Sequence, residues 1–130
     1  MVTKNDSEAE LTQEEFNEII NNSHKVVVVD FFAEWCMPCL MLAPIIDELA
    51  ESKNMKDVKF TKINIDENRE LAQKYNISSI PCLIIFKDGE EVGKIIGAQT
   101  AEFIEEKVKE HLWFLNYILE YNDVYKEKLC

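Results

Sequence analysis

The chain of 130 residues contains little glycine and proline, three residues of each, and only four cysteines. No low-complexity tract, internal repeat or interdomain linker is visible. No run of about 18 apolar residues occurs, so the sequence predicts no membrane-spanning helix. Positive charge is also scarce, because 14 Lys and Arg stand against 25 Asp and Glu, which gives a net charge of −11. This charge argues against binding to nucleic acid and to anionic membranes, whose phosphates would repel the chain.

The four cysteines, Cys36, Cys39, Cys82 and Cys130, are too few and too unevenly spaced for the disulfide framework of a small secreted protein. Residues 1–8 contain no apolar segment of the kind found in signal peptides, so we expect none. We therefore expect the protein in the reducing cytoplasm. In that compartment a close cysteine pair indicates catalysis or metal binding.

The composition is that of one folded domain. Hydrophobic residues make up 47% of the chain and charged residues 30%, so a buried core is expected and wholesale disorder is excluded. We predict a flexible acidic tail over residues 1–11 and a single domain over residues 12–112. Residues 113–130 are predicted to extend this domain as a helix that is apolar on more than one face. That extension could pack on its own domain, pair with a second copy in a homodimer, or dock another partner.

Hydrophobic periodicity predicts helices that alternate with strands. Four helices are expected. The first runs from the capping box Thr12–Glu15 to Asn22, the second follows Cys36 and is kinked at Pro44, the third covers 66–75, and the last begins near Thr100. Strands are expected over 26–32, 58–65, 82–87 and 91–96. The apolar positions of the second helix include Leu40, Leu42, Ile46 and Leu49, and those of the last are Phe103, Ile104, Val108 and Leu112. The last two strands flank Asp88-Gly89, which favours a hairpin. This order predicts the α/β class, with a central mixed β-sheet and helices on both of its faces.

The segment Trp35–Cys39, Trp-Cys-Met-Pro-Cys, lies where a predicted strand ends and a helix begins. The first turn of a helix presents free N–H groups and a partial positive charge, which together stabilise a thiolate. Cys36 is therefore predicted to have a lowered pKa and to act as a nucleophile. Cys39 lies about one helical turn further on, close enough to attack a mixed disulfide formed at Cys36.

The same two cysteines could instead hold zinc, which usually takes four ligands arranged as two close pairs. The other candidate ligands are Cys82, Cys130, His24 and His111, all of them isolated in the sequence. This spacing disfavours a metal site. No glycine-rich nucleotide loop occurs, so we expect no cofactor in the chain.

Over about residues 12–112 the chain resembles the thioredoxin family. The matching segments keep the family's order and are Val29–Cys36, Lys62–Asp66, Ile80-Pro81, Lys87–Gly89 and Gly97. The resemblance implies the thioredoxin fold and a protein-disulfide reductase that reduces target proteins through a reversible Cys36–Cys39 disulfide. Less favoured alternatives are a disulfide oxidase or isomerase of the thioredoxin-like type, and a thioredoxin-fold binding module whose thiols take no part.

The resemblance also assigns roles to residues around the pair. Cys36 is implied as the attacking thiol and Cys39 as the resolving thiol. Asp30 interrupts an apolar run, so its carboxyl should be buried and its pKa raised; in the family the equivalent carboxylate helps to deprotonate the resolving cysteine. Lys62 matches a lysine that lies near this carboxylate. Alternatively, Asp30 merely caps a neighbouring element and Lys62 is an ordinary surface lysine.

A target-binding surface is implied beside the pair, formed by Trp35, Met37, Pro38, Ile80, Pro81 and Gly97. Pro81 resembles the family's cis-proline. The Ile80 backbone would pair with an extended target segment, and Gly97 would let the backbone of the target approach. A strand end that needs a positive φ would explain Gly97 as well.

The chain departs from the family at several positions. Met37 stands where most members have glycine, and it could offer targets a soft apolar contact. Phe32 replaces a tryptophan, and Cys82 replaces a threonine. Cys82 is either a small buried core residue or a third redox thiol. The partners implied by the resemblance are target proteins with disulfides and a thioredoxin reductase, which would carry the NADPH and flavin.

Overall fold

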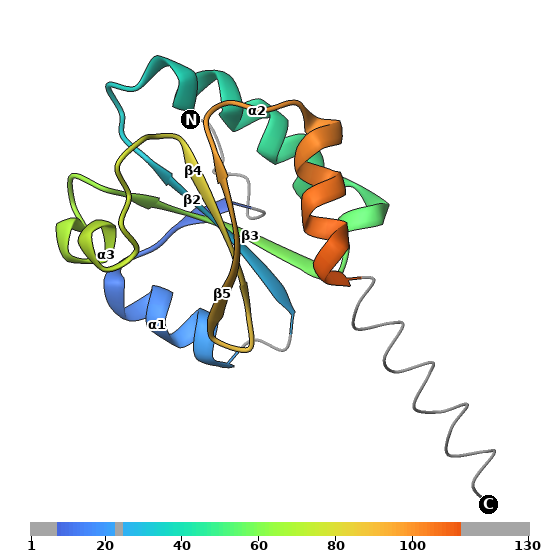
Figure 1. Cartoon of the computed structure of the whole chain (residues 1–130), viewed down its shortest axis with the longest axis horizontal. Helices are drawn as coiled ribbons and strands as arrows, with labels where there is room; N and C mark the ends of the chain where they lie inside the picture. Colours follow the sequence, from blue (N-terminus) through green and yellow to red (C-terminus); the bar gives the residue numbers. More distant parts are fainter. Residues whose placement is uncertain (1–7, 23–24, 113–130) are drawn as a thin grey trace, which may run out of the picture.

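The computed structural model describes residues 8–22 and 25–112, which form a sheet with helices on both sides (Figure 1). The elements are β1 (Glu8–Glu10), α1 (Gln13–Asn22), β2 (Val26–Phe32), α2 (Met37–Glu51), the 3-10 helix η1 (Lys53–Met55), β3 (Val58–Asn64), α3 (Arg69–Lys74), β4 (Cys82–Lys87), β5 (Glu90–Ile96) and a last helix over residues 101–112. Every strand and helix expected in this part of the chain is present, and β1 and η1 are additional. The described helices are all too short or too polar to span a bilayer.

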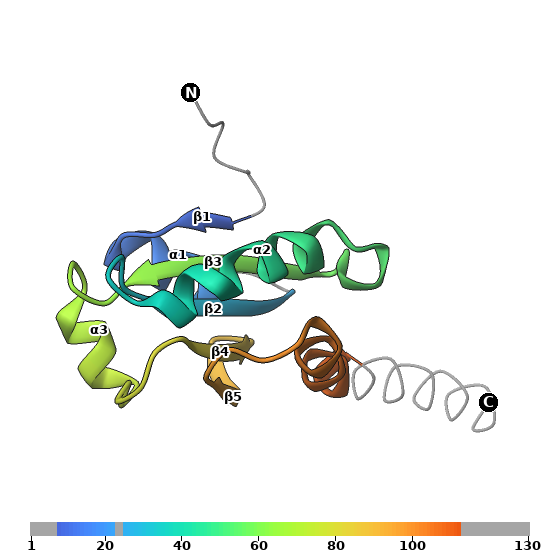
Figure 2. The ribbon, with the colours of Figure 1, turned by 90° about the horizontal axis from the view of Figure 1, so that it is seen from above.

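The strands form one mixed sheet in the order β1-β3-β2-β4-β5. β1, β3 and β2 run parallel, whereas β4 pairs antiparallel with both β2 and β5. Figure 2 shows the strands following one another in this order from top to bottom. The mixed sheet expected from the order of elements is confirmed.

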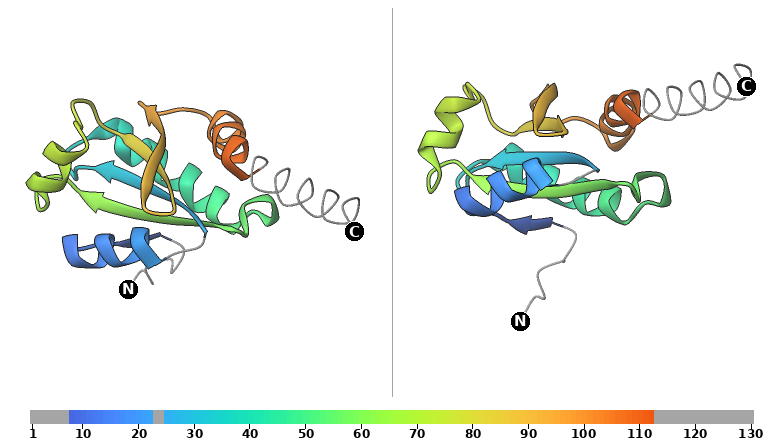
Figure 3. Two further views of the ribbon diagram at one scale, coloured as in Figure 1. Left: turned by 60° about the horizontal axis from the view of Figure 1, so that its bottom comes forward. Right: turned by 90° about the horizontal axis from the view of Figure 1, so that it is seen from below.

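The central strand β2 is buried on both faces, because its side chains alternate between two cores. Val26 and Val28 pack with the apolar sides of α2 and the 101–112 helix. Val27 and Val29 pack with the apolar sides of α1 and α3. Figures 1 and 3 show these two pairs of helices on opposite sides of the strands. The expected placement of helices on both faces is therefore confirmed.

Residues 8–11 are not part of a loose tail, which corrects the prediction made for residues 1–11. The three residues of β1 pair with β3 as an edge strand, and the N–H group of Leu11 donates to the carbonyl of Lys62 at 2.9 Å. The Leu11 side chain is buried in the core beside α1. So short a strand, bonded through its backbone, has no hydrophobic period, and the sequence pattern therefore does not reveal it. Residues 1–7 lie outside the described part of the chain.

Helix α1 begins at the predicted capping box. The N–H group of Glu15 donates to Thr12 Oγ1, and the N–H group of Thr12 donates to Glu15 Oε1, each at 3.3 Å. These reciprocal bonds satisfy N–H groups at the start of the helix that have no partner within it. The predicted start of this helix is confirmed.

Helix α3 begins later than predicted, at Arg69 rather than at residue 66. The side-chain oxygen of Asn64 accepts the N–H group of Asp66 at 2.9 Å, and Asn68 Nδ2 donates to the carbonyl of Asn64 at 3.0 Å. These bonds hold the chain in a turn after β3. The acidic residues that favour a helix start are therefore used in a turn instead.

Two of the apolar positions named for the helices, Phe103 and Leu40, are exposed. Adjacent residues of a helix point in directions about 100° apart, so only residues three or four apart share a face. Ile104 and Val108 share the buried face of the 101–112 helix, and Phe103 is turned away from it. Leu40 is turned away from the sheet in the same way, next to the buried Cys39.

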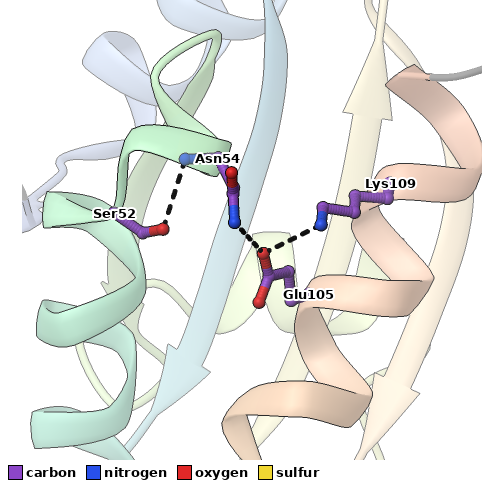
Figure 4. Close-up of polar contacts among 4 residues, drawn as sticks. All are labelled: Ser52, Asn54, Glu105 and Lys109. Carbon is purple, nitrogen blue, oxygen red and sulfur yellow. Dashed lines mark hydrogen bonds and ion pairs between the residues drawn. The ribbon is translucent and has the colours of Figure 1, made fainter.

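The 101–112 helix is tied by polar contacts to the segment that follows α2 (Figure 4). Asn54 Nδ2 donates to Glu105 Oε1 at 3.1 Å, and Lys109 Nζ lies 3.1 Å from the same oxygen. The hydrogen bonds from Lys109 and Asn54 lower the pKa of the Glu105 carboxyl. Such exposed pairs contribute little stability, so they add only weakly to the packing of this helix.

The C-terminal extension predicted over residues 113–130 lies outside the described residues, as do residues 23–24. Its packing, and a homodimer formed through it, stay predictions.

Replacing Leu11 by alanine tests whether the segment that follows β1 belongs to the core. Because Leu11 is buried, Leu11→Ala should lower the free energy of unfolding by about 2–4 kcal/mol. Urea denaturation followed by circular dichroism measures this change. The control is Gln13→Ala at an exposed position, which should change it by less than about 0.5 kcal/mol. An effect of Leu11→Ala as small as that of the control would mean that this segment is a tail after all.

Candidate functional site

The predicted cysteine pair lies at the junction between β2 and α2. The strand ends at Phe32, and a turn follows in which the N–H group of Cys36 donates to the carbonyl of Ala33 at 3.2 Å. Cys36 is the N-cap of α2, and its Sγ accepts the N–H group of Cys39 at 3.2 Å. A thiolate at Cys36 would therefore meet a backbone donor and the positive end of the helix dipole, both of which favour the ionised form.

Cys36 and Cys39 form a disulfide in this structure, with their Cα atoms 5.2 Å apart. Both are buried in a small apolar cluster with Ala33, against which Ile65 and Ile80 pack. The Cys36 Sγ lies 3.8 Å from the carbonyl oxygen of Ile80. The disulfide therefore lies in an apolar setting, bordered by the loop that carries Ile80.

The loop before β4 forms a second wall of the site. In Figure 1 this loop, the end of β2 and the start of α2 lie at the same end of the sheet. The Ile80-Pro81 peptide bond is cis, as the resemblance implies. The N–H group of Gly97 donates to the carbonyl of Pro81 at 2.8 Å, which ties the end of β5 to this loop.

Gly97 meets both conditions that sequence reasoning named for it. Its φ is +85°, a conformation that side chains with a Cβ rarely adopt. A Cβ at this position would meet no heavy atom closer than Gln99 Nε2, at 4.0 Å, so the space beside the backbone is open. The strand end thus needs glycine, and it also leaves room for another chain to approach.

Trp35 is exposed at the rim of the site, where its indole Nε1 donates to Asp66 Oδ2 at 2.8 Å. Asp66 is in turn held by the Asn64 side chain, which accepts its N–H group at 2.9 Å. Sequence reasoning assigned no role to Asp66 or Asn64. The available signal was the Asn-x-Asp pattern at the end of β3, which is typical of a turn closed by a side chain. These two residues give the site a fixed aromatic rim.

Asp30 lies in β2 and is 3% exposed. It is in register with Lys62 of β3 and Leu83 of β4, and it lies on the same face of the sheet as Val28, which packs in the core under α2. Burial raises the pKa of the Asp30 carboxyl from 3.8 to about 7, and the Lys62 ammonium limits this rise. Among the described residues, no group donates a hydrogen bond to Asp30 Oδ1. These findings agree with the burial and the raised pKa expected from the sequence.

Lys62 is half-buried and is in register with Asp30 on the neighbouring strand. Its Nζ lies 5.2 Å from the centroid of the Phe32 ring, within the range of a cation–π contact. Phe32 therefore helps to hold the Lys62 ammonium near the Asp30 carboxyl. The ammonium in turn favours the ionised form of that carboxyl.

The remaining predicted residues divide between the site and the core. Met37 and Pro38 are exposed in the first turn of α2. Cys82 is buried in the core formed by α1 and α3, and burial raises the pKa of its thiol. The interpretation of Cys82 as a core residue fits this placement. Cys130 and His24 lie outside the described residues. Within residues 8–22 and 25–112, no three His, Cys, Asp or Glu side chains are grouped as metal ligands would be.

The arrangement suits two-electron exchange between thiols and a disulfide. A sulfur that leaves as a thiolate is stabilised at the start of α2, so the Cys36–Cys39 bond can open and close. Asp30 can take or give a proton near neutral pH, because its pKa is about 7. The exposed Trp35 ring can contact a peptide beside the disulfide, and the space beside Gly97 leaves room for its backbone.

Comparison with known proteins agrees with this chemistry. The family model described as Thioredoxin matches residues 7–110. A thioredoxin of Chlamydia pneumoniae is 46% identical over 101 residues, which are 78% of this chain and 95% of that protein. A thioredoxin of Bacillus subtilis is 46% identical over 90 residues, which are 69% of this chain and 86% of that protein. The crystal structure of a thioredoxin from Nicotiana alata has a TM-score of 0.76 and 30% identity, and the match covers 85% of this chain and 97% of that one.

The family model covers most of the chain, and the structure brings Cys36 and Cys39 together as a disulfide. The chain therefore belongs to the thioredoxin family of protein-disulfide oxidoreductases, with Cys36 and Cys39 as its redox-active pair.

Proposed function

We propose that the protein is a cytoplasmic reductant of protein disulfides, which passes two electrons from the reduced Cys36 and Cys39 to a target protein. The observation that carries this proposal is the position of Cys36 at the N-cap of α2, where its Sγ accepts the Cys39 N–H group at 3.2 Å. This position favours the thiolate, and the thiolate is the nucleophile in disulfide exchange.

Reduction of a target proceeds in two exchange steps. First, the Cys36 thiolate attacks one sulfur of the target disulfide; a Cys36–target bond forms, and the second target sulfur leaves as a thiolate. Next, the Cys39 thiolate attacks Cys36 Sγ, which forms the Cys36–Cys39 disulfide and releases the first target sulfur as a thiolate. The target gains two electrons, and its thiolates take up the two protons that the cysteines lose. The Cα–Cα distance of 5.2 Å allows the second step without rearrangement of the helix.

Asp30 is the group that takes the proton of Cys39 before the second step. A thiol in an apolar cluster resists ionisation, because burial disfavours the charged form. A carboxylate with a pKa of about 7 can accept that proton and release it again at neutral pH. Asp30 lies on the sheet face that α2 covers, and Lys62 keeps its pKa from rising further.

Trp35, Ile80, Pro81 and Gly97 form the surface that receives the target. A target segment bonded to Cys36 passes beside Ile80, whose carbonyl oxygen is 3.8 Å from Cys36 Sγ. An extended segment can bond to the backbone there, as in the addition of a strand to a sheet. The open space at Gly97 admits its backbone, and Trp35, fixed by Asp66, supplies an apolar wall.

Regeneration of the thiols requires two electrons from another protein. A thioredoxin reductase that carries NADPH and flavin supplies them in this proposal, which rests on membership of the family. A redox potential well above that of cytosolic glutathione would instead favour the oxidase or isomerase alternative.

Reduction of insulin disulfides by dithiothreitol tests the activity. The wild-type chain should accelerate the precipitation of reduced insulin, and Cys36→Ser should abolish the acceleration, because the attacking sulfur is lost. Cys82→Ala is the control, since Cys82 is buried in the other core and should not be needed. No acceleration by the wild-type chain would remove the reductase function.

Replacing Asp30 by asparagine tests its proton-transfer role. Rapid-quench measurement should show Asp30→Asn forming the mixed disulfide at nearly the wild-type rate but resolving it about 10- to 100-fold more slowly near pH 7. Asp47→Asn, a change of carboxyl to amide on α2, is the control and should alter neither rate. Unchanged resolution in Asp30→Asn would mean that Asp30 moves no proton in this step.

The same substitution should also change how stability depends on pH. In the folded chain the Asp30 carboxyl has a pKa of about 7, against 3.8 ordinarily, so its ionisation opposes folding. Between about pH 4 and 7 the folded state holds the proton more tightly than the unfolded state, and this contribution to stability falls as the pH rises. Asparagine stays neutral, so Asp30→Asn should equal wild type near pH 4 and exceed it by about 4 kcal/mol above pH 7.

Urea denaturation of the oxidised proteins at pH 4 and pH 8 measures this difference, with Asp47→Asn as the control. An equal difference between Asp30→Asn and wild type at both pH values would contradict the raised pKa.

A further inference from the structure

The exposed face of α2 is apolar near the start of the helix and acidic towards its end. In its first two turns the exposed side chains include Met37, Leu40 and Met41, which are 66%, 54% and 67% exposed. Towards its end the exposed positions include Glu48 and Glu51. We call Met37, Leu40 and Met41 the α2 strip. The apolar part of this face is therefore the part next to the disulfide.

The α2 strip lies opposite the side of the helix that packs on the sheet. That buried side consists of Cys39, Leu42, Ile46 and Leu49. Lysine or glutamate would form the helix equally well at exposed positions and would not present apolar surface to water. Together with Trp35, the strip supplies four of the seven large hydrophobic side chains that are exposed within the described residues. Such a concentration of apolar surface is typical of a contact surface.

A target bonded to Cys36 has this strip within reach. Met37 follows Cys36 directly and opens the first turn of α2. Leu40 and Met41 lie about one turn, or 5.4 Å, further along the helix, which an extended peptide spans in about two residues. The strip is therefore continuous with the place where the mixed disulfide forms.

We propose that Leu40 and Met41, together with Met37, bind apolar side chains that flank the reactive cysteine of a target, and so select disulfides in apolar segments. The selection rests on the proposed function, because it needs a mixed disulfide at Cys36. Removing apolar surface from water favours such targets, and the two thioether side chains adapt to varied shapes. The net charge of −11 disfavours targets with acidic flanks.

Single-turnover reduction of two symmetrical peptide disulfides tests this selection. One peptide carries leucine and valine around its cysteine, and the other carries serine and asparagine. Reduced protein is mixed with each peptide and quenched with acid, and the released peptide thiol is measured by mass spectrometry. Wild-type protein should reduce the apolar peptide about tenfold faster than the polar one, and the double variant Leu40→Ser with Met41→Ser should lower this ratio to about two or less.

Phe103→Ser is the matched control, because Phe103 is another exposed apolar side chain on a helix. Its ratio should equal that of wild type. Each ratio compares two substrates of one protein, so it does not depend on how much of that protein is folded. A ratio that stays at the wild-type value in the double variant, or that falls equally in Phe103→Ser, overturns the selection. Wild-type protein that reduces neither peptide nor glutathione disulfide overturns the proposed function and the selection with it.

Methionine oxidation measures the contact itself. Hydrogen peroxide transfers one oxygen to a thioether sulfur, which gives the sulfoxide and water. In Cys39→Ser the disulfide between Cys36 and a peptide persists, because the resolving thiol is missing. Met41 should be oxidised severalfold more slowly with the apolar peptide attached than with Cys36 capped by a methylthio group. Met55 is fully buried and serves as the unreactive reference. Equal rates at Met41 in the two states contradict the contact.

Discussion

The exclusion of water from the Asp30 carboxyl is the constraint on which the rest of the site depends. β2 can bury a carboxyl because it is the central strand, covered by α2 and the 101–112 helix on the face that Asp30 shares. This burial raises the pKa to about 7, while Lys62 in the neighbouring strand keeps the ionised form accessible. Burial alone would favour a permanently neutral acid, and exposure alone would give a permanent carboxylate. Burial and the Lys62 charge together give Asp30 a pKa of about 7, so that its carboxyl can exchange a proton near neutral pH.

The junction that follows the same strand supplies the redox chemistry. A sulfur at the N-cap of α2 lies where a helix leaves backbone N–H groups without partners, and these groups favour a thiolate there. The sheet order then places β4 beside β2, and the loop before β4 brings the Ile80 carbonyl to 3.8 Å from Cys36 Sγ. The site is therefore assembled from segments far apart in the sequence by one strand pairing. The α2 strip adds a surface that touches the target without taking part in the exchange.

Much of this could be predicted, because the decisive signals are local. The apolar run of β2 fixes both its limits and the burial of Asp30, and the strand-to-helix boundary places Cys36. Three features could not be predicted from the sequence, each for a physical reason. β1 is held through its backbone and has no hydrophobic period. Asp66 gains its role only through the Trp35 indole, which comes from another segment. Leu40 has the residue type of a core position, but it is exposed because a helix turns about 100° per residue.

The proton affinity of Asp30 tests the account most directly, since it results from the burial of β2 and the proposed proton transfer in the resolving step requires it. Protein labelled with carbon-13 at the aspartate side-chain carboxyls can be titrated by NMR in the oxidised state, with Asp30→Asn used to assign the Asp30 signal. We expect a midpoint at about pH 7. A midpoint near 4, the value of an ordinary aspartate, would show that water reaches this carboxyl and would contradict its role as the proton carrier of the site.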